Sequence, residues 1–232
     1  MENETILMHP IAHIRSDFPT KFGIPKQSGL SSALEARVVF CPEYRSADAV
    51  RGLEDFSYIW LLWQFSAAVR DGEKFSPTVR PPRLGGNERV GVFASRSPFR
   101  PNHIGISSVR LERVDFTQEG PVLIVRGADL MDGTPILDVK PYIPYADSHP
   151  DATGGFTDTR SARTLRVEIP EKLLTRIPEE KRESLREVLE QDPRPSYQDD
   201  PNRIYGFGFA GMEVRFRAGD GVLTVTDIQK KN

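Results

Sequence analysis

Arginine, glycine and proline are concentrated in residues 80–107, a composition that could bind an anionic ligand. This stretch contains five arginines, four prolines and four glycines, and it contains no lysine. A guanidinium presents a rigid fork of N–H donors that matches the oxygens of a carboxylate or a phosphate, whereas a lysine ammonium does not. Glycine and proline fix turns and let the backbone approach a bound molecule closely. The stretch therefore predicts a set of binding loops rather than a packed element.

Positive charge is concentrated in one part of the sequence, although the chain as a whole is weakly acidic. Residues 80–113 hold seven arginines against Glu88 and Glu112, a local sum of +5, whereas the formal net charge of the chain is −2. A polyanionic partner would therefore meet this patch and not a generally basic surface. The alternative is a solvated basic face offset by acidic neighbours. The arginines alternate with glycine and proline instead of following a helix, which favours binding.

Three aspartates form a second candidate cluster within residues 127–142. Asp132 precedes Gly133, and this pair is typical of a hairpin turn, so its presence has a structural explanation. Asp129 comes before the turn and interrupts an apolar strand, which makes it the stronger candidate for a chemical role. Asp138 lies between two apolar residues and could either face solvent or pair with an arginine.

Other short motifs do not indicate a nucleotide or metal site. Residues 206–211 satisfy G-x-G-x-x-G, but the alternating apolar residues after them predict a strand where a dinucleotide-binding loop requires a helix. The four histidines have no carboxylate or cysteine at metal-ligand spacing, so no metal is expected. The single cysteine, Cys41, excludes an intrachain disulfide.

The elements that must position these residues are mainly short strands separated by turns. Strands are expected over residues 5–14, 34–40, 58–65, 106–116 and 121–130. A turn-rich arm covers 15–30, a short helix is expected over 47–56, and Asp132-Gly133 is expected to close a hairpin. Because these strands do not alternate with long helices, a barrel or sandwich is favoured over a doubly wound sheet.

The composition changes over residues 149–163, which predicts a linker between a domain of residues 1–150 and a smaller one of residues 151–232. The second domain is expected to hold a strand at 165–170, a helix at 178–192 that begins at Pro178, and a hairpin around 218–221. These elements predict a small α+β domain.

No secretory signal is visible in the first residues, which lack a basic start followed by an apolar run. The most apolar stretch, residues 58–65, is far too short to span a membrane. A soluble, cytoplasmic protein with no membrane partner is expected.

Five segments of the chain form a recognisable set: IRSDFPTKFGIPKQSGL, DAVRGLEDFSYIWLLWQF, VRPPRLGGNERVGVFASRSPFRPNHIGIS, DLMDGTPILDVKPYIPYADS and DPRPSY. In this order they resemble the TrmO (YaeB/TsaA-like) family of S-adenosylmethionine-dependent tRNA (adenine-N6)-methyltransferases. The resemblance implies a mainly β chain: a single-sheet, non-Rossmann β-barrel methyltransferase domain followed by a small C-terminal α+β domain that contacts tRNA. It also implies a homodimer.

The same resemblance implies a reaction. The expected activity transfers a methyl group from S-adenosylmethionine to N6 of N6-threonylcarbamoyladenosine at position 37, in the anticodon loop of threonine tRNA. Two alternatives remain open. The same barrel could methylate another RNA or a small molecule, or the chain could be a non-catalytic RNA-binding module.

Cofactor-binding positions can be carried over from the family one by one. They are Gln27, Ser28, Gly29, Phe65, Ser66, Arg96, Ile106, Asp129 and Leu130. Arg96 is expected to bind the methionine carboxylate, and Asp129 is the candidate catalytic base that removes the N6 proton, with the threonyl carboxylate of the substrate as the alternative. The chain departs from the family pattern at Ser66, which replaces a histidine, and at Ser28 and His103, which replace prolines.

Substrate contacts are expected mainly in the arginine-rich stretch. Arg83, Arg89 and Arg100 would meet loop phosphates or the threonyl carboxylate, and Asn87 and Phe99 would read or stack on a base. In the DPRPSY segment, Arg194 and Tyr197 either add an RNA contact or belong to a proline-stiffened loop that closes the second domain.

Overall fold

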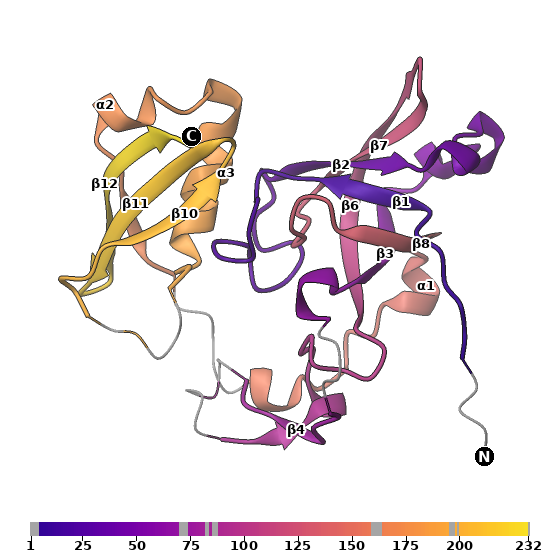
Figure 1. Cartoon of the computed structure of the whole chain (residues 1–232), viewed down its shortest axis with the longest axis horizontal. Helices are drawn as coiled ribbons and strands as arrows, with labels where there is room; N and C mark the ends of the chain where they lie inside the picture. Colours follow the sequence, from indigo (N-terminus) through magenta and orange to yellow (C-terminus); the bar gives the residue numbers. More distant parts are fainter. Residues whose placement is uncertain are drawn as a thin grey trace.

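The structure is a computed structural model that describes residues 5–69, 74–81, 84, 88–158, 164–194, 198 and 200–231. Figure 1 shows a barrel of strands beside a smaller sheet that carries helix α3, with the segment that holds β4 below them. Among the described residues, no helix is long and apolar enough to cross a membrane.

Six strands close into an antiparallel barrel in the order β1-β2-β7-β6-β3-β8. They are β1 (Ala12–Arg15), β2 (Glu35–Phe40), β3 (Tyr58–Gln64), β6 (Ile104–Thr117), β7 (Gly120–Arg126) and β8 (Pro135–Pro141). Antiparallel neighbours, with no crossover helix among the described residues, confirm the predicted non-Rossmann barrel.

The barrel interior is filled by alternate residues of its strands, as the period of two requires. In β3, Ile59, Leu61 and Trp63 point inward and are buried, although the sequence of this strand is too apolar to show alternation by itself. Strand β7 is buried on both faces from Pro121 to Val125. Burying one such large side chain stabilises the fold by about 1.5–3 kcal/mol.

Short elements lie between the barrel strands and after the last of them. They are η1 (Pro42–Tyr44), η2 (Ala47–Val50), η3 (Leu53–Asp55), η4 (Ser66–Ala68), β4 (Thr78–Val79), β5 (Val90–Gly91), η6 (Val92–Ala94), α1 (Pro144–Asp147) and η7 (Gly155–Thr157). The helix expected over residues 47–56 is thus two 3₁₀ turns, interrupted at Gly52, whose φ is +80°. Ser46 caps the first of these turns, because its hydroxyl oxygen accepts a hydrogen bond from the amide of Asp48.

The hairpin predicted at Asp132-Gly133 is wrong. These residues form a turn, and Gly133 has the positive φ that favours glycine, but strands β7 and β8 are not neighbours in the barrel. Strand β8 pairs with β1 and β3 instead. The amide of Gly133 donates to the carbonyl of Ile14 at 2.9 Å, so the turn packs against the end of β1. Barrel closure, and not the turn residues, decides which strands pair.

The C-terminal residues form a four-stranded sheet in the order β10-β11-β12-β9, with helices α2 and α3. Its elements are β9 (Arg166–Glu168), α2 (Glu171–Leu174), α3 (Glu179–Glu190), β10 (Tyr205–Phe209), β11 (Met212–Gly219) and β12 (Val222–Lys230). The predicted helix is confirmed, and Leu185, Val188 and Leu189 on one of its faces are buried. The G-x-G-x-x-G segment lies in the β10–β11 hairpin, as the alternating residues after it predicted.

The arm predicted over residues 15–30 extends in the structure over residues 16–34, and the name arm is used for this range below. It connects β1 to β2 but packs on the C-terminal sheet. Phe18 and Leu34 belong to the hydrophobic core of that sheet. Gly23 has φ +96°, and a Cβ at this position would collide with the ring of Phe207. The arm therefore joins the two cores, although it is continuous with barrel strands at both ends (Figure 1).

Candidate active site

A cavity of about 430 Å³ lies where β3 ends and β6 begins. Four separate segments line it: arm residues 21–27, residues 63–68 of β3 and η4, residues 95–106 around the start of β6, and residues 129–134 between β7 and β8. The barrel positions three of these segments, and the arm supplies the fourth. The volume of the cavity lies within the range of small-molecule sites, about 300–1,000 Å³.

Most residues carried over from the family meet in this cavity. Gln27, Phe65, Ser66, Arg96, Ile106, Asp129 and Leu130 all line it. Ser28 and Gly29 stand just outside: the amide of Ser28 hydrogen-bonds to Asp129, and that of Gly29 donates to the carbonyl of Gly127 at 2.9 Å. The geometry thus assembles the expected set, while the binding role of each residue stays a prediction.

Asp129 lies at the inner wall of the cavity, within a chain of hydrogen bonds. The Ser107 hydroxyl donates to its Oδ1 at 2.6 Å, and the Trp63 indole N–H donates to the Ser107 oxygen at 3.0 Å. Burial raises the pKa of the Asp129 carboxyl, while the Ser107 hydrogen bond and the nearby Arg96 charge oppose the rise. Neither Trp63 nor Ser107 was identified from sequence.

Arg96 faces the same cavity from the loop before β6. Its guanidinium donates to the Gln27 side-chain oxygen at 2.6 Å, so the arm and the arginine loop touch across the cavity. Arg96 is exposed and lowers the pKa of Asp129 by its charge. The cavity thus holds a cation near a carboxyl, and the guanidinium can bind a ligand carboxylate.

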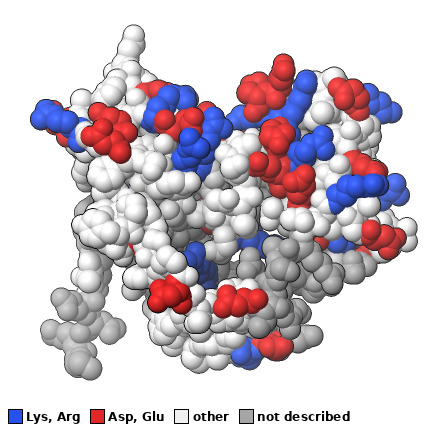
Figure 2. Space-filling view, turned by 180° about the vertical axis from the view of Figure 1, so that it is seen from behind, with Lys and Arg blue, Asp and Glu red and all other residues white. Residues whose placement is uncertain are grey.

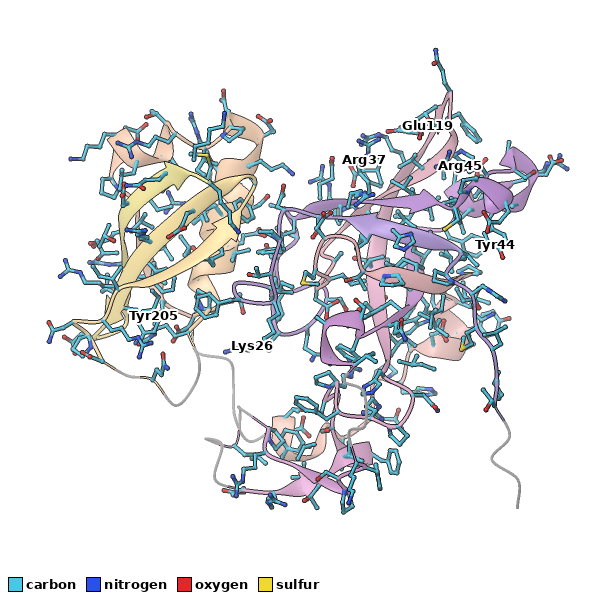
Figure 3. The ribbon with its side chains drawn as sticks, in the orientation of Figure 1. Lys26, Arg37, Tyr44, Arg45, Glu119 and Tyr205 are labelled. Atoms are coloured by element: carbon cyan, nitrogen blue, oxygen red, sulfur yellow. The ribbon has the colours of Figure 1, made fainter. Side chains whose placement is uncertain are left out.

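The cavity is strongly cationic. Lys21, Lys26, Arg96 and Arg100 line it, and Asp129 is the one acidic residue among the described residues of its lining. Figure 3 shows Lys26 extending from the arm toward the segment that holds β4. Figure 2 shows acidic and basic side chains interspersed over the upper part of one face, with further Lys or Arg atoms inside the hollow at its centre. An anionic ligand would therefore be attracted to this cavity more than to the outer surface.

Helix α3 holds both ends of the arm. Lys181 pairs with Asp17 at 2.7 Å near its start. Near its end, Glu187 accepts hydrogen bonds from the Ser31 hydroxyl at 2.7 Å and from the Ala33 amide at 2.9 Å. The middle of the arm, which lines the cavity, is thus fixed by a helix of the C-terminal part.

His103, which the family resemblance places at a proline position, holds the loop before β6 through its backbone and its ring. Its φ is +49°, a value that the proline ring cannot adopt. Its Nδ1 lies 2.8 Å from the carbonyl of Pro98, and its own carbonyl accepts the amide of Phe65 at 2.8 Å. These contacts hold the loop in this conformation and connect it to the end of β3.

The residues predicted to meet RNA fall into four groups, of which Arg194 is the last. Arg83, Asn87 and Tyr197 lie outside the described residues. Phe99 and Arg100 line the cavity, and Arg100 donates to the carbonyl of Ser95 at 2.6 Å while its guanidinium lies 5.9 Å from the centre of the exposed Phe93 ring. Arg89 is exposed and donates to the Thr78 hydroxyl at 2.8 Å.

Arg194 is occupied inside the C-terminal part. Its guanidinium makes two hydrogen bonds to the Asp192 carboxylate, at 2.8 and 2.9 Å, and one to the carbonyl of Ala218 at 3.0 Å. Only 10% of its side chain is exposed. For Arg194, this geometry favours a structural role within the second domain over an RNA contact.

In the part of the chain that the structure describes, no group of three or more His, Cys, Asp or Glu residues could hold a metal ion. The site instead combines a closed antiparallel barrel with a cationic cavity and one half-buried carboxyl. These features define a class of ligand-binding β-barrel proteins that is distinct from Rossmann-type nucleotide-binding proteins.

Comparison with known protein families shows which family within this class the chain matches. The profile described as tRNA-methyltransferase O N-terminal domain matches residues 13–148, and the TrmO C-terminal domain matches residues 162–231. The chain belongs to the TrmO family.

Relatives and solved structures agree with this assignment. The chain is 41% identical to the Escherichia coli (strain K12) tRNA (adenine(37)-N6)-methyltransferase over 95% of this chain and 97% of that protein. It is 41% identical to a Pseudomonas aeruginosa protein, RcsF, whose name refers to an S-adenosylmethionine-dependent methyltransferase, over 89% of this chain and 90% of that protein. A crystal structure of TrmO from Pseudomonas aeruginosa matches with a TM-score of 0.80 and 34% identity, covering 99% of both chains.

Proposed function

We propose that the chain is an S-adenosylmethionine-dependent tRNA (adenine-N6)-methyltransferase that acts on the adenine at position 37. The observation that carries this proposal is the shared cavity of Arg96 and Asp129 in a chain of the TrmO family. The finer proposal is that the adenine already carries an N6-threonylcarbamoyl group and that threonine tRNA is the main substrate. The resemblance described above supports this finer assignment.

The residues present fit S-adenosylmethionine. Arg96 would hold the methionine carboxylate, and either Asp129 or nearby backbone carbonyls would accept hydrogen bonds from the ammonium or ribose groups. Ile106 and Leu130 would form the apolar wall for adenine. When bound, S-adenosylmethionine supplies an electrophilic methyl group on a positively charged sulfur.

The contribution of the protein would be to place N6 and to remove its proton. The N6 lone pair of threonylcarbamoyladenosine is delocalised into the purine and the carbamoyl group, so it is a poor nucleophile while N6 is protonated. Asp129 would accept that proton. Its raised pKa makes it a stronger base than an ordinary aspartate, and a positioned base contributes roughly 10²–10⁴-fold in rate.

The remaining cations support an anionic substrate. Lys21, Lys26 and Arg100 line the cavity in addition to Arg96, and they would attract loop phosphates or the threonyl carboxylate. The exposed rings of Phe93 and Phe99, which are 72% and 43% exposed, offer surfaces on which an unpaired base can stack. The family resemblance also supports a homodimer, which light scattering would detect as about twice the chain mass of 26.1 kDa.

Transfer of a labelled methyl group from S-adenosylmethionine tests the proposal. The tRNA is taken from cells with and without the threonylcarbamoyl modification, and each product is digested to nucleosides. Label in modified threonine tRNA alone is the expected result. Label in unmodified tRNA would contradict the finer proposal, and no label in any RNA would leave the small-molecule or RNA-binding alternatives.

A further inference from the structure

Ser107 is buried between two groups that together fix its hydrogen-bond direction. The indole N–H of Trp63 is a donor and nothing else, so at 3.0 Å it must occupy a lone pair of the Ser107 oxygen. A serine hydroxyl has one proton. Since Ser107 is 1% exposed, that proton has no solvent partner and points to Oδ1 of Asp129 at 2.6 Å.

The pairing of β3 with β6 places the Trp63 indole within reach of Ser107. Trp63 pairs with Gly105 across β3 and β6, and Ser107 lies two residues further along β6, within diagonal reach of a long side chain. A Cβ at Gly105 would collide with the Trp63 ring. Glycine at this position therefore lets the indole lie across the strand and reach Ser107.

We propose that Trp63 and Ser107 give the two oxygens of Asp129 different roles, so that Oδ1 stays a hydrogen-bond acceptor and Oδ2 receives the N6 proton. This inference rests on the proposed function, in which Asp129 is the base. In the step itself the N6–H bond breaks, its electron pair stays on nitrogen, and the proton forms an O–H bond with Oδ2. Ser107 acts through Asp129 and is a positioning residue.

The Ser107 hydrogen bond also sets the basicity of Asp129. A hydrogen bond to the charged form lowers a pKa, so the Ser107 hydroxyl opposes the effect of burial on Asp129, and the backbone amides of Asp129 and Ser28 do so to a smaller extent. The charged groups that line the cavity with Asp129 are Lys21, Lys26, Arg96 and Arg100, and all of them favour the ionised form. Loss of the hydroxyl should therefore raise the pKa of Asp129 while the cations remain in place.

The test measures the protonation of Asp129 directly, in the full chain without cofactor. Carboxyl carbons are labelled with ¹³C in all aspartates, and the Asp129 signal is identified by its loss in Asp129→Asn. Ser107→Ala is expected to raise the pKa of Asp129. Trp63→Phe keeps a ring at this position but removes the N–H, and it is expected to move the pKa because Ser107 is then free to rotate. Ser108→Ala is the control, since Ser108 is the next residue on β6, on its opposite face.

Turnover is measured against pH with the same variants. In Ser107→Ala, the acidic limb of kcat should shift to higher pH, with the KM for S-adenosylmethionine little changed, because Arg96 is intact. An unchanged Asp129 pKa in folded Ser107→Ala and Trp63→Phe would overturn the inference. Full turnover of Asp129→Asn would overturn Asp129 as the base, whatever the titration shows, so the two failures are distinguishable.

Discussion

Arg96 and Asp129 carry opposite charges toward one cavity, and each has a contact that fixes its position. Arg96 is connected to the arm through Gln27, and Asp129 to the barrel wall through Ser107. This arrangement separates the two tasks of the site. The exposed cation would bind a flexible charged end of the ligand, while the half-buried carboxyl meets the reacting part.

Replacing Arg96 tests the first task. Arg96→Gln should weaken binding of S-adenosylhomocysteine roughly ten- to a hundredfold, because a charge-assisted hydrogen bond contributes about 1.5–3 kcal/mol. Isothermal titration calorimetry measures the affinity. Arg89→Gln is the control, since Arg89 comes from the same arginine-rich stretch but does not line the cavity. Equal affinities in both variants would exclude Arg96 as a cofactor ligand.

The raised pKa of Asp129 predicts a pH-dependent stability cost. A carboxyl with a raised folded-state pKa contributes stability that is fully present below the unfolded value, near 3.8, and is lost as pH rises through the folded value. Urea unfolding of Asp129→Asn and the parent chain from pH 4 to pH 7 should show the variant gaining relative stability as pH rises. A difference that is constant over this range would contradict the prediction. A bound sulfonium would offset the cost, because it brings a positive charge to the cavity.

The charged residues of the site were easier to identify from the sequence than the residues that hold them in position. Asp129 was identified because a charge that interrupts an apolar strand is unusual, whereas Arg96 was identified through the family motif that contains it. Trp63 and Ser107 gave no such signal, since an aromatic and a serine are ordinary strand residues, and their contact depends on the pairing of β3 with β6. Local sequence does not specify that pairing.

At the scale of elements, helix α3 holds the arm although none of its residues lines the cavity. Glu187→Ala removes the acceptor of the Ser31 hydroxyl and the Ala33 amide, and this should lower the free energy of unfolding by about 1–3 kcal/mol. It should also weaken S-adenosylhomocysteine binding, because the arm is released at one end. Hydrogen exchange of residues 28–34 and calorimetry measure the two effects.

Glu183→Ala is the matched control for this helix. Glu183 is one turn away and exposed, so its loss should change neither arm exchange nor ligand affinity. Unchanged exchange of the arm in Glu187→Ala would show that the hydrophobic contacts of Phe18 and Leu34 hold it sufficiently.

Elements with strong local patterns were predictable, and those set by long-range pairing were not. Strands β2 and β3 and helix α3 were located within a few residues. The aromatic, apolar run of β3 favours a buried strand, and a starting proline with one apolar face favours helix α3. The hairpin at Asp132-Gly133 failed because β8 joins β1 and β3 to close the barrel. The 47–56 helix is interrupted at Gly52, where φ is positive.

At the scale of the whole molecule, two cores share one connecting segment. We propose a boundary between residues 1–150 and 151–232, which is supported by separate hydrophobic clusters on either side. The arm is the exception, because Phe18 and Leu34 come from the first part and pack in the core of the second.

This exception predicts the behaviour of a fragment of residues 1–150. Without the C-terminal sheet, Phe18 and Leu34 would be exposed, and each loses about 1.5–3 kcal/mol of burial. The fragment is expected to keep the strand signal in circular dichroism but to bind S-adenosylhomocysteine more weakly than the full chain. Equal affinity would show that the arm needs no support from the second part.

The two attachments of the arm to α3 join residues 164 and 156 positions apart, Asp17 with Lys181 and Ser31 with Glu187. During synthesis, the first partner of each pair leaves the ribosome long before the second has been made. A nascent chain can thus close its barrel early, but the arm has nothing to hold it until α3 has emerged. Translation therefore completes the cavity near its end, and truncated products released before that point lack a finished ligand site.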